Sequence, residues 1–245
     1  DCSVDVFVHE NPPNKVNLAA YYIDKFEVTN AIYQDCVAEG VCSEPTELSS
    51  ATRDSYYGNS QYDNYPVVFV DWDMAKLYCE WRGARLPTEA EWEKSARGPD
   101  GRTYPWGNDP PGDKHGCFGF KEGRPCKPGS YPGGDSPYGV ADMSGNVWEW
   151  IADVYDPSYY PRSPKIDPTG GTCETSIAFF NKLRREGKRG FTGSNPIPKE
   201  CERGLRGGAW NYGARGLRAS NRVHHHKRFR IKVAGIRCGA DAPSP

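Results

Sequence analysis

Cysteine is the residue type with the greatest chemical potential in this sequence of 245 residues. The nine cysteines are Cys2, Cys36, Cys42, Cys79, Cys117, Cys126, Cys173, Cys201 and Cys238. Thiolate metal sites usually contain CxxC pairs, and the sequence has none. Three pairs instead have the short spacings of loops closed by disulfides: Cys36 with Cys42, Cys117 with Cys126, and Cys173 with Cys201. These spacings predict three local disulfides in a secreted, periplasmic or cell-surface protein, with Cys2 left unpaired.

Histidine offers a second kind of chemistry in the run His224, His225 and His226, which lies in a basic segment. From Arg203 to Arg237 the sequence contains no acidic residue. This segment is either a solvated face balanced by acids elsewhere in space, or a site for an acidic ligand. Successive residues of a strand point to opposite faces, so at most two of the three histidines converge. Such a pair, together with an aspartate or with His115, could hold a transition metal; a solvated turn is the simpler interpretation.

Other classes of protein lack support in the sequence. The net charge of −1 gives no overall attraction to nucleic acid, and we expect none as a partner. No run of about 18 apolar residues is present, so we expect no membrane span. The chain begins at Asp1 without an apolar segment, and we expect any signal peptide to be already absent. No GxSxG, HExxH or P-loop motif occurs.

The elements that must position these residues are short. Mean hydropathy is −0.77, and 27 glycines and 21 prolines favour a loop-rich α+β fold. Residues 20–28 read as a strand, and Thr29 or Asn30 begins a helix that runs to Val37 and is ended by Gly40. The polar segment 42–65 reads as a surface loop.

Two further helices are predicted before a long irregular region. Asp71 or Asp73 caps the first, which Gly83 ends. Thr88 and Glu91 form the capping box of the second, which ends at Gly98.

The second half of the chain alternates strands with loops. The irregular region 99–142 leads to a strand at 146–151, and 152–203 is a long insertion that contains one amphipathic helix within 175–190. The strand-like pieces that follow are 203–212, 216–222 and 233–241.

Four motifs in this order carry a resemblance to a known family. They are YYIDKFEVTNAIY (21–33), WRGARLPTEAEWEKSARG (81–98), YGVADMSGNVWEW (138–150) and LRGGAW…AGIRCGAD (205–241). Over residues 17–241 the chain resembles the formylglycine-generating enzyme, or sulfatase-modifying factor, family. The resemblance implies an α+β variant of the C-type lectin fold, stapled by disulfides and poor in regular secondary structure. We expect a single domain over residues 1–245.

The resemblance also implies a long-range disulfide and a metal site. Cys79 and Cys238 stand where the family has a bonded pair. A structural Ca²⁺ is expected at Asp142, Glu149 and the carbonyls of Gly145 and Val147, which are the hard oxygen ligands that this ion accepts. The alternative is that the two carboxylates only brace the turn. A second calcium site of the family falls near residues 115–135, where the Cys117–Cys126 disulfide is expected to replace the ion.

The chain departs from the family at the residues that carry its chemistry. The family's enzymes oxidise a substrate cysteine with a cysteine pair that binds Cu(I), placed shortly after an RGGS motif. Here no cysteine lies between Glu202 and Arg237, and Tyr212 with Ala214 or Leu217 occupies those positions. Cu(I) prefers soft thiolate ligands, so we expect neither a Cu(I) site nor formylglycine formation.

Two hypotheses about function follow. The first is a non-catalytic binding or scaffold module whose partner is a small molecule, a peptide or a protein, with an acidic ligand favoured. Its ligand-binding face would consist of Trp210, Asn211, Tyr212, Arg215, Arg218, Arg222, His224, His225 and His226. The alternative is an enzyme that uses no cysteine, such as an oxidoreductase acting on a small molecule, as in siderophore maturation. A deep pocket with a perturbed carboxylate would favour the enzyme, and a shallow basic groove the binding module.

Overall fold

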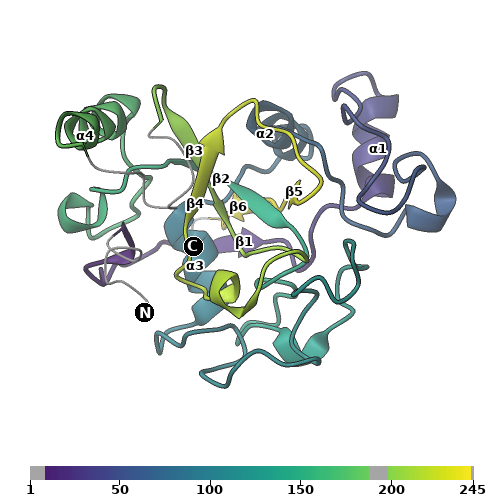
Figure 1. The fold of residues 1–245 in the computed structure, drawn as a ribbon, viewed down its shortest axis with the longest axis horizontal. Coiled ribbons are helices and arrows are strands. Elements are labelled where there is room, and N and C mark those ends of the chain that lie inside the picture. The colour runs from purple at the N-terminus through teal and green to yellow at the C-terminus, as the bar shows by residue number, and fades with distance from the viewer. Residues whose placement is uncertain (1–8, 188–197, 244–245) are drawn as a thin grey trace.

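A computed structural model describes residues 9–187 and 198–243 of the chain (Figure 1). Its helices are α1 (Asn30–Ala38), α2 (Trp72–Trp81), α3 (Glu89–Arg97) and α4 (Cys173–Arg185). Its strands are β1 (Tyr21–Ile23), β2 (Trp148–Val154), β3 (Glu202–Arg206), β4 (Val223–His226), β5 (Ala234–Gly235) and β6 (Gly239–Asp241). Four 3-10 turns are η2 (Ser60–Tyr62), η3 (Pro132–Gly134), η4 (Tyr160–Arg162) and η5 (Ala214–Leu217). Long loops connect these elements, as the glycine and proline content predicts.

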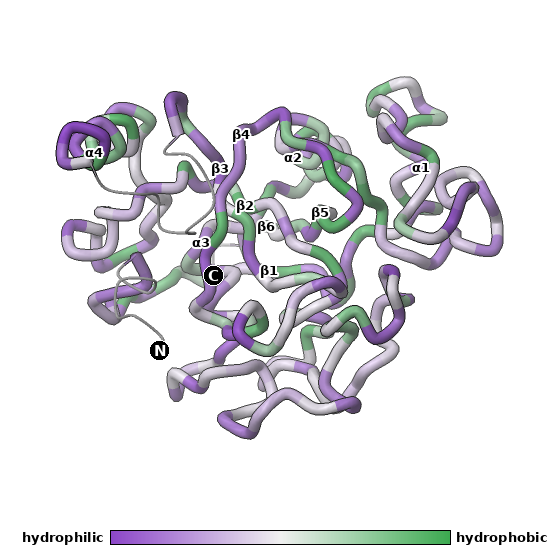
Figure 2. The backbone as a smooth tube through the Cα atoms, viewed as in Figure 1, coloured by the Kyte–Doolittle hydropathy of each residue, from purple (hydrophilic) through white to green (hydrophobic). Residues whose placement is uncertain are grey.

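Two sheets organise the described chain. The larger sheet has the strand order β4-β3-β2-β5, in which only the β2–β5 pair is parallel. The smaller sheet pairs β1 with β6, so a segment near the start of the chain lies beside one near its end. Figure 2 shows hydrophobic residues gathered around the central strands and hydrophilic ones along the outer loops. The core includes the indoles of Trp148 and Trp150 on β2.

The predicted helices are confirmed, and so are the capping side chains of α2 and α3, whereas the Thr29 side chain at the start of α1 makes no capping hydrogen bond. The Asp71 side chain accepts a hydrogen bond from the backbone N–H of Met74 at the start of α2. Thr88 and Glu91 form the predicted capping box of α3, each side chain satisfying the other's backbone N–H. The expected strand at 20–28 is shorter than predicted, since only Tyr21–Ile23 pairs with β6.

Four disulfides join the predicted partners: Cys36–Cys42, Cys79–Cys238, Cys117–Cys126 and Cys173–Cys201. The prediction for Cys2 lies outside the described residues. Within the described ranges, no helix is long and apolar enough to cross a membrane.

Two local predictions in the C-terminal segment are wrong. Residues 216–222, expected as a strand, begin in the 3-10 turn η5 and continue as a loop. The three histidines, expected in a solvated turn, lie in strand β4, where Gly204 pairs with His224 and Glu202 with His226. Strand β3 supplies the backbone hydrogen bonds that make 223–226 a strand, and the local sequence does not indicate this partner.

Candidate functional site

The nine residues predicted to bind a ligand do not share one open surface. Trp210, Arg222 and His224 are buried, with at most 5% of each residue exposed. Tyr212 is 41% exposed, and Arg215 is also exposed. The remaining residues are partly buried, namely Asn211, Arg218, His225 and His226. The structure therefore divides the predicted face into an aromatic part, an internal ion-paired part and a histidine part.

The aromatic part gains a residue that the sequence did not indicate, Phe120. The Phe120 ring, 64% exposed, meets the buried Trp210 ring edge-to-face at 5.9 Å between centroids. The Tyr212 ring meets the buried Trp148 ring in the same manner at 5.1 Å. We call Phe120, Trp210 and Tyr212 the aromatic surface. Each outward ring rests on an indole, in the geometry that aromatic pairs prefer.

Backbone hydrogen bonds join the two segments of this surface. The N–H of Gly119 donates to the carbonyl of Tyr212 at 2.7 Å, and the N–H of Phe120 donates to that of Trp210 at 2.9 Å. The loop that bears Phe120 is closed by the Cys117–Cys126 disulfide. Ordered in this way, the two rings lose little freedom when a ligand covers them.

Asn146 holds this loop and Trp210 together. Its Oδ1 accepts the N–H of Cys126 at 2.8 Å, and its own N–H donates to the carbonyl of Cys117 at 2.8 Å. Its carbonyl accepts the N–H of Trp210 at 2.8 Å, and its Nδ2 donates to the Glu27 carboxylate. Asn146 is fully buried with φ of 58°, a left-handed conformation that asparagine tolerates better than most residues.

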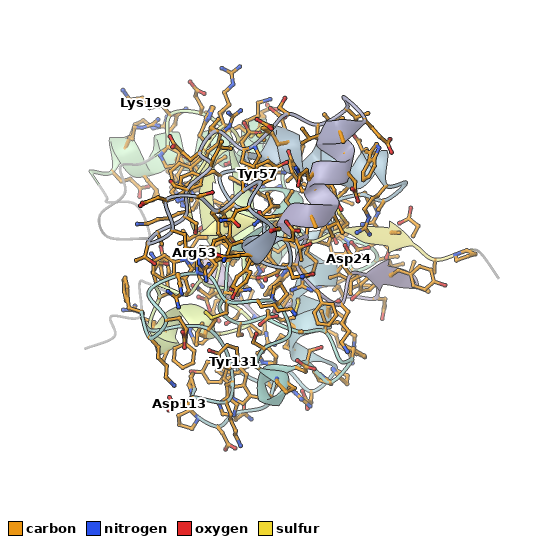
Figure 3. The ribbon with its side chains drawn as sticks, turned by 90° about the vertical axis from the view of Figure 1, so that its right-hand side faces the viewer. Asp24, Arg53, Tyr57, Asp113, Tyr131 and Lys199 are labelled. Carbon is orange, nitrogen blue, oxygen red and sulfur yellow. A yellow bond between two sulfur atoms is a disulfide. The ribbon has the colours of Figure 1, made fainter. Side chains whose placement is uncertain are left out.

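The disulfide loop is also tied to the tyrosine-rich segment 42–65. Arg53 donates from Nη1 to the carbonyl of Pro125 at 3.2 Å. Its guanidinium lies 4.6 Å from the centroid of the Tyr62 ring and 4.4 Å from that of Tyr65. Figure 3 shows Arg53 near the middle of this side of the molecule, between Tyr57 and Tyr131 in the view.

The internal part consists of arginines neutralised by distant acids. Arg222 forms a bidentate pair with Glu89 at the start of α3, with both N–O distances 2.7 Å. Arg218 forms a similar pair with Glu10, at 2.5 and 2.7 Å. Both guanidinium groups are therefore engaged by carboxylates of this chain.

The histidines separate according to the alternation of the strand. On one face His224 pairs with Glu202 and stacks on Tyr155, with ring centroids 4.0 Å apart. His226 on the same face contacts Glu200 at 2.9 Å. His225 points the other way and stacks on Phe229 at 3.7 Å. Among the described residues, no group of three or more His, Cys, Asp or Glu side chains is arranged to hold a metal.

An open groove of about 550 Å³ lies beside this histidine face. It is lined by Lys199, Glu200, Glu202, His226, Lys227 and Arg228. In Figure 3 Lys199 and Asp113 stand at opposite ends of the view. Because Lys121 of the disulfide loop contacts Asp113 at 2.7 Å, that loop and the groove are separate regions.

The turn expected to bind calcium carries buried oxygen atoms. Asp142 accepts the N–H of Gly129 at 2.6 Å. Gly145 and Val147 are buried, and within the described residues no hydrogen bond to either of their carbonyl oxygens is found. Glu149, by contrast, is held by Arg237 at 2.7 and 2.9 Å and by the Trp92 indole at 2.5 Å. Asp142 and the two carbonyls are thus oxygen groups of the kind that a hard cation accepts, whereas Glu149 is already engaged by a guanidinium.

Several carboxyl groups in the interior have raised pKa values. Burial, with the Asp142 and Glu149 carboxylates nearby, raises the pKa of Glu27 well above its usual range. Burial also raises the pKa of Asp142 to about 6. Burial and the Glu89 carboxylate raise the pKa of Asp153 to about 8. At most 6% of each of these three residues is exposed, so these carboxyl groups do not face an open ligand site.

Two residues of this site, Phe120 and Asn146, were not predicted from the sequence. Phe120 lies in a glycine-rich loop without periodicity, and only the disulfide spacing marked that loop as ordered. Asn146 follows Gly145 in the turn whose other residues were assigned to calcium. An asparagine after a glycine in a tight turn was the available signal for a left-handed, hydrogen-bonding residue.

Comparison with protein families gives a match along nearly the whole chain. The family described as "Sulfatase-modifying factor enzyme 1-like domain" matches residues 3–242.

Curated relatives with several functions are similar to parts or all of the chain. A formylglycine-generating enzyme of Streptomyces coelicolor is 43% identical over 124 residues, which are 44% of this chain and 38% of that protein. A hercynine oxygenase of Mycobacterium tuberculosis is 29% identical over 98% of this chain and 56% of its own length. An inactive C-alpha-formylglycine-generating enzyme 2 of Mus musculus is 43% identical over 38% of this chain and 33% of that protein. The chain thus spans about half or less of the length of these relatives.

Two solved structures share the fold along 99% of this chain. Treponema denticola variable protein 1 has a TM-score of 0.69 with 20% sequence identity, and 90% of that chain is covered. PvdO from Pseudomonas aeruginosa has a TM-score of 0.69 with 23% identity, and 88% of it is covered.

Proposed function

The chain belongs to the sulfatase-modifying factor enzyme 1-like family and has the expected α+β, C-type-lectin-like fold; on this premise we propose that it is a non-catalytic binding module. The proposed ligand contacts are on the aromatic surface. In this proposal the family's scaffold is kept while its oxidation chemistry is absent, as the name of the inactive mouse relative states for that protein.

The observation that carries the proposal is the contrast between exposed rings and enclosed carboxyl groups. Phe120 and Tyr212 present rigidly seated aromatic area to solvent. Exposed aromatic groups of this kind mark binding surfaces, because an aromatic ring offers a large contact area with few rotatable bonds. The carboxyl groups with the most strongly raised pKa values, Glu27 and Asp153, are buried, and each accepts hydrogen bonds from the protein. An acid–base catalyst needs contact with its substrate.

Formylglycine formation is the activity to test first. Neither Tyr212 nor the buried Leu217 supplies a thiolate for Cu(I). We expect copper-loaded protein, incubated under oxygen with a peptide containing a sulfatase cysteine motif, to leave the peptide mass unchanged. The Streptomyces coelicolor enzyme serves as the positive control. Conversion of the peptide thiol to an aldehyde by this chain would refute the non-catalytic proposal.

A second candidate is an oxidoreductase that uses no cysteine, favoured by the match of the hercynine oxygenase to 98% of this chain. Oxygen consumption in the presence of hercynine and a thiol distinguishes the two functions. A binding module gives no consumption above that of protein-free solution.

We further propose that the turn at Asp142 binds a structural calcium ion. Arg237 contacts Glu149 and lies near Glu27 and Asp142, so these three carboxylates would leave an excess of buried negative charge if all were ionised. A cation relieves such an excess. Calcium at about 100 times its Kd would stabilise the fold by about 2.7 kcal/mol.

Chelation is the corresponding test. The melting temperature should fall when EGTA is added to the unmodified protein, and Asp142→Asn should remove this response. Equal melting curves with and without EGTA would refute the calcium proposal. An oxidising location, namely secreted, periplasmic or cell-surface, is also proposed, with the four disulfides as its support.

A further inference from the structure

We propose that the aromatic surface recognises a peptide segment of a partner protein in which an aromatic or aliphatic side chain stands beside a carboxylate. This inference rests on the binding function proposed above and specifies the chemistry of its ligand. It also assigns the charge preference to one residue, Lys232.

The apolar half of the ligand follows from the two outward rings. Phe120 and Tyr212 belong to adjacent, hydrogen-bonded segments, and each is seated on a buried indole. They therefore offer a pre-ordered apolar area rather than mobile side chains. A side chain of a partner that covers both rings removes apolar surface from water at small entropic cost.

The acidic half follows from the charges around the rings. The segments 117–126, 210–217 and 230–233 together carry five Lys and Arg residues and a single acid, Glu122. Lys121 is neutralised by Asp113 at 2.7 Å, and Arg230 by Asp71 at 2.7 Å.

Lys232 is the cation assigned to contact the ligand carboxylate. Its Nζ lies 5.9 Å from the centroid of the Trp210 ring, the same ring that supports Phe120. Lys232 is exposed, and in the described part of the chain no carboxylate lies within 4.0 Å of its Nζ. A ligand carboxylate beside the rings would supply the missing counter-charge.

A flat macromolecular partner suits this surface better than an enclosed small molecule. The rings lie on two adjacent segments and are 64% and 41% exposed, whereas small-molecule sites bury most of their ligand. The groove beside His226 is a separate region and contributes no ring of the aromatic surface.

The test is selection from a phage-displayed library of random peptides on the full chain. Enriched peptides are then synthesised and their Kd values measured by fluorescence anisotropy. The variants are Phe120→Ser with Tyr212→Ser, and Lys232→Glu. Tyr138→Ser is the matched control, because Tyr138 is 53% exposed and lies beneath another ammonium, that of Lys94 at 5.6 Å. Melting curves establish that each variant is folded.

We expect enriched peptides to pair an aromatic or aliphatic residue with Asp or Glu. The double serine variant should abolish their binding, Lys232→Glu should weaken it at least tenfold, and Tyr138→Ser should leave it unchanged. Salt should weaken binding to the unmodified chain more than to Lys232→Glu. Peptides that need the rings but have no acidic preference would refute the ligand class and leave the binding function standing. A library with no peptide dependent on Phe120 and Tyr212 would refute the proposed function itself.

Discussion

Replacement of Asn146 tests whether one buried side chain holds the binding surface together. In Asn146→Ala the Cys126 N–H loses its acceptor and the Glu27 carboxyl loses a donor. The unpaired Cys126 N–H costs about 1–3 kcal/mol, and Glu27, which still accepts the Val147 N–H, loses one hydrogen bond worth about 0.5–1.5 kcal/mol. The left-handed φ of 58° adds about 1 kcal/mol for alanine. We therefore expect a loss of about 4 kcal/mol in the free energy of unfolding, from these group costs taken together.

Asn146→Gly separates the two contributions. Glycine removes the same side-chain hydrogen bonds but adopts a positive φ freely, so its loss should be about 1 kcal/mol smaller than that of alanine. Asn221→Ala is the matched control, because the Asn221 amide makes one hydrogen bond, to the Gly216 carbonyl at 3.0 Å. It should cost about 1 kcal/mol.

Urea unfolding and calorimetry measure these differences. In a chain of this size 1 kcal/mol corresponds to about 2–4 °C in Tm, so Asn146→Ala should melt about 8–16 °C below the unmodified protein. Peptide binding to the aromatic surface should weaken as well, since the Trp210 segment and the disulfide loop lose their common tie. Losses below about 1 kcal/mol for both Asn146 variants would show that the Asn146 hydrogen bonds contribute little to the stability of the fold.

Two further predictions concern stability. Replacing both Cys79 and Cys238 by alanine should cost about 5 kcal/mol and replacing both Cys36 and Cys42 only about 2 kcal/mol, because the first bridge closes a separation of 159 residues and the second one of 6. Equal losses in urea unfolding would contradict this dependence on loop length. Asp153 has a folded pKa of about 8, raised by burial and by Glu89, against about 4 when unfolded. Between these two pKa values the folded state holds a proton on Asp153 that the unfolded state has lost, so stability should fall as pH rises from 4 to 8. Asp153→Asn should flatten the profile of Tm against pH. An unchanged slope would refute the raised pKa of Asp153.

The parts of the fold that the sequence predicted are those specified by local chemistry. The capping box of Thr88 and Glu91 places two side chains within one helical turn, so its outcome depends on few other residues. The short disulfide loops are local in the same sense. The Cys79–Cys238 bridge needed the family resemblance, since its partners lie 159 residues apart.

The parts that could not be predicted depend on partners far along the chain. Arg218 and Arg222 were assigned to a ligand because no acid lies near them in the sequence, yet Glu10 and Glu89 neutralise them in the fold. His224 likewise became buried because Tyr155 and Glu202 meet it across strands. The net charge of a sequence segment does not predict the charge of the surface it forms, because acidic residues distant in the sequence can pair with its basic residues in the fold.

The pairing of β1 with β6, backed by the Cys79–Cys238 bridge, gives the domain an unusual response to mechanical force. A pull applied at the outer ends of Tyr21 and Asp241 would peel this antiparallel pair from its open end, one hydrogen bond at a time. Once residues 24–78 had also extended, the load would reach the covalent bridge, and the 159-residue span between the cysteines would bear no tension. At about 3.5 Å per extended residue, roughly 550 Å of chain is thereby withheld from extension. The aromatic surface lies wholly within that span, so its own segments would bear no tension, although Glu27 and Arg53, which contact Asn146 and the disulfide loop, lie outside it.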